Sequence, residues 1–92
     1  MNNLLYDAVK NHTQIEFTYA GKLRTVEPYV YGSLNSDINA FHAKENGKDK
    51  LFHESKMSNL TALHTTFASI VQPVSENKKS IKSIWKKIYI IG

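Results

Sequence analysis

Four histidines could supply metal-binding chemistry if the fold brought them together: His12, His42, His53 and His64. Imidazoles that bind zinc usually occur as closely spaced pairs, such as His-x3-His, with a further ligand nearby. None of the four shows that spacing, and no pattern of acidic neighbours completes a site. We therefore interpret them as ordinary strand or loop residues, and we expect no metal and no cofactor.

Catalytic motifs offer little more. Ser75–Lys78 and Ser83–Lys86 both match Ser-x-x-Lys, a motif of some serine hydrolases, but serine and lysine are abundant enough here for chance matches. The chain has no Gly-x-Ser-x-Gly segment and no glycine-rich phosphate loop. It also has no cysteine, which excludes a thiol nucleophile, disulfides and zinc sites with sulfur ligands. We expect a protein that is not an enzyme.

The composition is that of one small globular domain spanning residues 1–92, with 41% apolar residues. No apolar run approaches the roughly 20 residues that a membrane-spanning helix needs. The first residues carry no basic side chain ahead of Asp7, so they do not read as a secretory signal. These features predict a cytoplasmic protein.

Positive charge is concentrated at the end of the chain. Residues 1–72 hold seven basic and seven acidic residues, whereas residues 73–92 hold five lysines and Glu76, which accounts for the net charge of +4. Such asymmetry suggests a nucleic acid or an acidic membrane surface as partner. A lysine-rich helix face that is simply solvated explains it equally well.

The pattern predicts a helix followed by a hairpin. Asn3 can cap a short helix that ends near Asn11, with apolar residues at helical spacing. Residues 14–19 alternate apolar and polar side chains, which is typical of a half-buried strand. Ala20-Gly21-Lys22 supplies a turn, and residues 23–31 return as the second strand.

Three more strands are expected over residues 38–44, 50–54 and 60–67, with Asn46-Gly47 as a hairpin turn. The polar segment 55–59 should turn a corner between the last two. Five strands with short connections suit a small SH3-like barrel over about residues 14–67.

The last segment, about residues 77–91, is predicted to form an amphipathic helix. Apolar residues recur there at helical intervals: Ile81, Ile84, Trp85, Ile88 and Ile91. This helix could close the barrel, form a homodimer face through Trp85, or present lysines to phosphate or lipid. Residues 88–91 alone could instead form a strand, because the spacing of apolar residues in so short a run does not distinguish a helix from a strand.

Two segments carry a resemblance to a known family: Arg24-Thr-Val-Glu-Pro-Tyr-Val-Tyr-Gly32 and Lys50-Leu-Phe-His-Glu-Ser-Lys-Met-Ser-Asn-Leu60. Together with Ile38-Asn-Ala-Phe-His42, they resemble the core of a WYL domain. That family is a small β-barrel module of bacterial regulators that is thought to sense nucleic acids or nucleotide-like ligands. The chain departs from the family pattern at Asn39 and Asp49, and it has lysine at positions 50 and 56 where the family usually has arginine. Lysine can still contact phosphate but lacks the two-pronged donor geometry of arginine.

The resemblance implies a ligand-binding surface of cationic and aromatic side chains. Its expected members are Arg24, Tyr29, His42, Lys50, His53 and Lys56, assisted by a basic surface of Lys78, Lys79, Lys82, Lys86 and Lys87. Single strands bind such surfaces by phosphate contacts and by base stacking. Two alternatives stay open: Arg24 could form a surface ion pair with Glu27 or Glu54, and Tyr29, Tyr31 and Phe41 could be core residues.

The resemblance therefore predicts a standalone sensing module that binds single-stranded nucleic acid or a nucleotide-like ligand. It would modulate a partner in transcription or in a CRISPR-type or phage defence system, as some standalone relatives do. The roughly thirteen residues before the first strand leave no room for the helix-turn-helix that usually accompanies the family. The alternatives are a protein-interaction or oligomerisation module without a ligand, and an idle remnant of a longer regulator.

Overall fold

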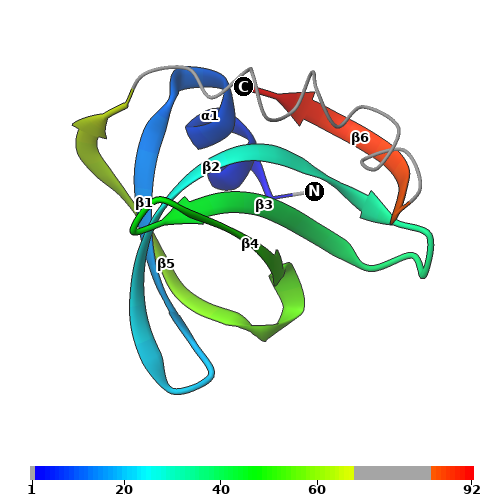
Figure 1. Ribbon diagram of the computed structural model, residues 1–92, viewed down its shortest axis with the longest axis horizontal. Coiled ribbons are helices and arrows are strands. Elements are labelled where there is room, and N and C mark those ends of the chain that lie inside the picture. The colour runs from blue at the N-terminus through cyan, green and yellow to red at the C-terminus, as the bar shows by residue number, and fades with distance from the viewer. Residues whose placement is uncertain (1, 68–83) are drawn as a thin grey trace.

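The computed structural model describes residues 2–67 and 84–92, which form one α-helix, six antiparallel strands and one 3-10 turn (Figure 1). In chain order the elements are α1 (Asn3–Asn11), β1 (Thr13–Tyr19), β2 (Lys22–Leu34), β3 (Asn39–Glu45), β4 (Lys48–His53), η1 (Glu54–Lys56), β5 (Met57–Thr66) and β6 (Trp85–Ile91). The prediction of a mostly β protein is confirmed, and β1 to β5 correspond to the five expected strands.

Two tight turns set the register of the hairpins. Ala20 and Gly21 have φ values of 54° and 75°, and Asn46 and Gly47 have φ values of 54° and 80°. Two consecutive left-handed residues make the turn whose twist matches that of the flanking strands. Both hairpins predicted from these residues are therefore confirmed.

The corner predicted for residues 55–59 takes the form of a 3-10 turn and a bulge. The turn is η1, and Asn59 then adopts a φ of 55° inside β5. The pairing of β1 with β5 shifts register at this point, as expected where an extra residue is inserted into a strand.

The sheet is organised around β2, which changes partner along its length. Its first part pairs with β1, from Lys22 opposite Tyr19 to Val26 opposite Ile15. After Val26 the strand leaves β1, and its other edge pairs with β3 from Glu27 onward. The strand order is β4-β3-β2-β1-β5, and the end strands β4 and β5 are not paired with each other. The sheet is therefore open, and the predicted closed SH3-like barrel is not supported.

The predicted C-terminal helix is wrong over the residues that the structure describes. Residues 85–91 form β6, which pairs with β2 from Leu34 opposite Trp85 to Val30 opposite Ile91 (Figure 1). This is the edge of β2 that β1 has vacated, so its backbone groups need partners. Isoleucine is β-branched and packs well in a strand. Pairing with the distant strand β2 therefore decides the conformation of this segment, although its apolar residues have helical spacing. Residues 77–83 of that prediction lie outside the described residues.

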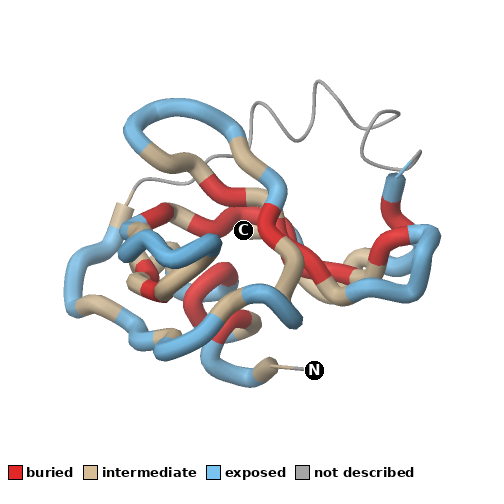
Figure 2. Tube along the Cα trace, turned by 90° about the horizontal axis from the view of Figure 1, so that it is seen from below, coloured by how far each residue is buried: buried red, intermediate tan, exposed pale blue. Residues whose placement is uncertain are grey.

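The main core lies between α1 and the sheet. Leu5, Ala8 and Val9 of α1 are buried in it, and Figure 2 shows the buried stretches of the helix and the strands. Phe17 and Phe52 pack edge to face with ring centroids 5.2 Å apart, and Phe41 contacts both rings. Such aromatic pairs each add about 0.5–1.5 kcal/mol beyond the area they bury.

The helix is capped one residue earlier than predicted. Asn2, rather than Asn3, accepts a hydrogen bond through its side-chain oxygen from the Leu5 amide at 3.1 Å. The Asn2 amide in turn donates to the Tyr31 hydroxyl at 2.9 Å, which fixes the start of α1 against β2. In the described parts of the chain, no helix has the length and apolar character needed to cross a membrane.

A second apolar cluster lies on the opposite face of β2 and β3. Its buried members are Tyr29, Val30, Leu34, Ala40 and Trp85. Ala40 belongs to this cluster while its neighbour Phe41 belongs to the main core, because successive residues of a strand point to opposite faces. The aromatic residues that sequence left open as core members, Tyr29, Tyr31 and Phe41, are all buried.

Candidate functional site

Two of the predicted cationic residues converge on one carboxylate. Arg24 of β2 donates through Nη1 to Glu45 Oε1 at 2.9 Å, and Lys50 of β4 donates through Nζ to the same oxygen at 2.6 Å. We call Arg24, Glu45 and Lys50 the Glu45 cluster. Ion pairing of Arg24 was anticipated, but its partner is Glu45 at the end of β3 rather than Glu27 or Glu54.

The strand register explains why these side chains meet. Lys50 pairs with Ala43, and Glu45 lies two residues further along β3 on the same face as Ala43. Arg24 lies two residues before the buried Val26, on the core side of β2. The cluster therefore sits at the rim of the main core, next to Phe52.

The Glu45 cluster carries a surplus of positive charge. It holds two cations and one anion, and the hydrogen bond from Lys50, followed by that from Arg24, lowers the pKa of Glu45. The Glu45 side chain is 11% exposed and Arg24 20%, whereas Lys50 is 41% exposed and reaches solvent. Glu45 therefore stays ionised, and one unit of positive charge remains uncompensated within the cluster.

Arg24 also has donor capacity that the described residues do not use. Its Nε atom is buried and has no hydrogen-bond partner there. The guanidinium carbon lies 6.0 Å from the centroid of the Phe52 ring, at the outer limit of a cation–π contact. Because the Nε–H is enclosed by the protein, a ligand of Arg24 must approach the terminal nitrogens of the guanidinium instead.

Tyr29 and His42 lie on the other face of the sheet, away from the Glu45 cluster. Their rings are stacked with centroids 6.0 Å apart, and His42 meets Trp85 edge to face at 5.6 Å. Burial lowers the pKa of His42, and the nearby carboxylate of Asp49 only partly opposes that effect. The imidazole is therefore neutral near pH 7.

A small polar network continues from this aromatic group. The Tyr29 hydroxyl donates to Asp49 Oδ1 at 3.0 Å, and Lys44 Nζ lies 3.2 Å from the same oxygen. Burial, with the Asp49 contact, raises the pKa of Tyr29 far above its usual value, so its hydroxyl remains protonated. Asp49 thus has a structural role beside Tyr29.

His53 and Lys56 belong to neither group. The His53 amide donates to the Tyr19 hydroxyl at 3.2 Å, and its side chain is half-buried at the end of β4. Lys56 is exposed in η1 and forms no ion pair within residues 2–67 and 84–92. The six predicted residues therefore form two separate groups and two peripheral positions, not one surface.

The predicted basic surface is only partly described. Lys86 and Lys87 are exposed on β6, and Lys86 contacts Asp37 at 2.5 Å. Lys78, Lys79 and Lys82 lie outside the described residues. Within the described ranges, no group of three or more His, Asp or Glu side chains is arranged to hold a metal ion.

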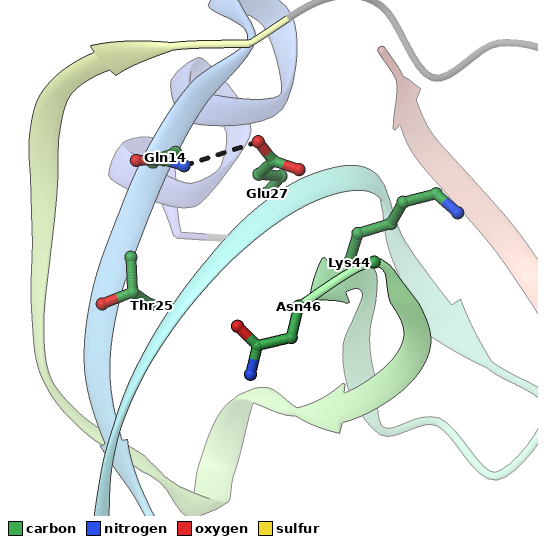
Figure 3. A pocket seen from close by; sticks show the side chains of 6 residues that line it. Gln14, Thr25, Glu27, Lys44 and Asn46 are labelled. Atoms are coloured by element: carbon green, nitrogen blue, oxygen red, sulfur yellow. Dashed lines mark hydrogen bonds between the residues drawn. The ribbon is translucent and has the colours of Figure 1, made fainter.

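A polar pocket that the sequence did not reveal opens where β2 leaves β1 (Figure 3). Its volume is about 280 Å³, and it is lined by Gln14, Thr25, Glu27, Lys44, Asn46 and Gly47. Gln14 Nε2 points from β1 toward Glu27 and donates to its Oε2 at 3.4 Å. The pocket contains none of the six predicted residues, and its lining has no aromatic ring on which a base could stack.

Glu45 is the member of the candidate site that sequence reasoning missed. It precedes the Asn46-Gly47 turn, whose geometry places Glu45 directly opposite Lys48 and two residues from the Lys50 position. The alternation of β4 then puts Lys50 on the same face. That inference was available from the hairpin register alone.

Comparison with protein-family models, with curated proteins and with solved structures found no match to this chain. The function must therefore be argued from the chemistry of the site.

Proposed function

We propose that this protein is a WYL-like module that binds phosphate-bearing ligands, either single-stranded nucleic acid or a nucleotide-like molecule, at the Glu45 cluster. One observation carries the proposal: Arg24 and Lys50, from separate strands, meet at one point with a surplus of positive charge. Arginine and lysine next to an aromatic ring are the usual components of phosphate sites.

Exposure of the cluster supports access by a ligand. Lys50 is the most exposed of its three members, so an anion can reach it from solvent. Phe52 supplies the neighbouring aromatic ring, with its centroid 6.0 Å from the guanidinium carbon of Arg24. The role as a regulator of a partner in transcription or defence rests on the WYL resemblance alone and is part of the same proposal.

Binding of labelled oligonucleotides, followed by fluorescence anisotropy, tests the proposal. Affinity should fall between about 50 mM and about 200 mM salt, because phosphate contacts release counterions. Lys50→Ala should weaken binding by about tenfold or more, since a lost hydrogen bond to a charged group costs about 1.5–3 kcal/mol. Lys10→Ala is the matched control, since Lys10 is exposed on α1 and the charge change is the same.

Absence of binding at low salt, or equal losses in the two lysine variants, would contradict the proposal. Thermal stability should be almost unchanged in both variants, because both side chains are substantially exposed.

A second candidate function, self-association, is favoured by β5. This ten-residue strand carries no charged residue, has no buried position and has no strand on its outer edge within the described residues. An open edge without charge is a template for pairing with another strand. Light scattering of the wild type and of Ala62→Lys measures whether the protein is a monomer or a dimer. A dimer formed through β5 should dissociate in the variant, and a monomeric wild type would contradict self-association.

A further inference from the structure

The Glu45 carboxylate already occupies the place that a ligand phosphate would take. A single oxygen, Oε1, accepts from both cations, and the Glu45 side chain is 11% exposed. A ligand that uses both Arg24 and Lys50 must therefore compete with an anion that the protein itself supplies. A ligand binds with favourable free energy only if its contacts with Arg24 and Lys50 are stronger than those of Glu45.

A phosphodiester gains little binding free energy by replacing Glu45 at the two cations. It carries about one negative charge, so it replaces one carboxylate by one anion of the same charge and leaves the surplus positive charge uncompensated. The carboxylate also has the advantage of being attached to the protein at the correct distance, so it competes as an intramolecular group.

A terminal phosphate, which is a monoester, differs in charge and in acceptor number. It carries about −1.5 to −2 charges near pH 7 and presents three acceptor oxygens. That charge balances Arg24 and Lys50 together. Its oxygens suffice for the two donors that Glu45 now accepts from, Lys50 Nζ and Arg24 Nη1, with one oxygen to spare.

We infer that the Glu45 cluster selects terminal phosphate groups, as found on nucleoside monophosphates and on phosphorylated ends of oligonucleotides, over internal phosphodiesters, with Glu45 as the competing internal anion. This inference rests on the proposed function and refines it, because it names the part of the ligand that the site holds. Glu45 acts here as a specificity-determining residue.

The first test uses the wild-type protein and two labelled single strands of the same sequence, one with a 5′-phosphate and one with a 5′-hydroxyl. We expect the phosphorylated strand to bind about tenfold more tightly, which corresponds to about 1.4 kcal/mol. Equal affinities for the two strands, with both weakened by Lys50→Ala, would overturn the inference and leave the proposed function standing. Failure of both strands to bind at low salt would overturn the proposed function as well.

The second test removes the competitor. Glu45→Gln keeps the size of the side chain but not its charge, so both strands should bind more tightly, again by about tenfold. Unchanged or weaker binding by a folded Glu45→Gln variant would show that Glu45 positions the cations and does not compete. The comparison of strands in the wild type decides the question even if this variant is unstable.

A competition with AMP and with adenosine separates the two sources of a terminal phosphate. Displacement of the phosphorylated strand by AMP, but not by adenosine, indicates a free nucleotide as ligand. Preference for the phosphorylated strand without displacement by AMP indicates that the end of a strand is recognised. Displacement by adenosine as effective as that by AMP would contradict selection of phosphate.

Discussion

Replacement of Gly32 by alanine tests whether β6 is seated on β2 as the structure describes. A Cβ atom at this position would lie 2.4 Å from the carbonyl oxygen of Lys87, 3.0 Å from the Cα of Ile88 and 3.0 Å from Cε3 of Trp85. Two of these three atoms belong to the backbone, so rotation of a side chain cannot relieve the clash. The strand β6 must move away from β2.

We expect the substitution to destabilise the protein by about 1–3 kcal/mol, the usual cost of forcing extra volume into a packed region. For a domain of this size each kcal/mol lowers Tm by about 4–8 °C. The chain has a single tryptophan, Trp85, which is 5% exposed and lies against Gly32. Movement of β6 should therefore also shift the native fluorescence emission to longer wavelength.

Gly47→Ala is the matched control. The chemical change is identical, but no atom lies within 4 Å of the added Cβ, and the cost comes only from the φ of +80°. It should lower Tm without shifting the emission of the native protein. If Gly32→Ala keeps the wild-type Tm and emission, the pairing of β6 with β2 is refuted.

Two further perturbations concern the partly buried imidazole of His42 and the hydroxyl group of Tyr31. The pKa of His42 is lowered in the folded state, so its stabilising effect is complete above about pH 6.5, the unfolded value, and is lost as the pH falls toward the folded pKa. Urea unfolding at pH 7.5 and pH 5 should show this loss in the wild type and a smaller one in His42→Gln. Tyr31→Phe removes the hydroxyl that accepts from the Asn2 amide and donates to Glu54. It should cost about 1–3 kcal/mol in urea unfolding, and an unchanged midpoint would contradict the link between α1 and η1.

Local patterns predicted most of the sheet. Alternation of Ile15, Phe17 and Tyr19 identified β1, and Asn46-Gly47 identified the turn between β3 and β4, because both are consequences of backbone geometry over a few residues. The strand β6 was predicted only in part, as the alternative to a helix for residues 88–91. Its conformation depends on the vacant edge of β2, which is distant in sequence.

The candidate site was predicted only in part, because it too depends on contacts between residues that are distant in sequence. The meeting of Arg24 with Lys50 required pairing across three strands, and the resemblance to a family pointed to both residues without revealing Glu45 between them. The separation of His42 from this cluster could have been read from position alone. Residues 41, 43 and 45 share one face of β3, so residue 42 must point to the other.

Because β2 changes partner along its length, the amide hydrogens of its two halves should exchange with solvent by different opening motions. Amides of Lys22–Val26 that bond to β1 exchange only when the β1–β2 hairpin opens. Those of Val30–Leu34 that face β6 exchange as soon as β6 lifts from the sheet, which requires no disruption of the hairpin. One continuous strand should therefore show two distinct levels of deuterium protection, divided near Pro28.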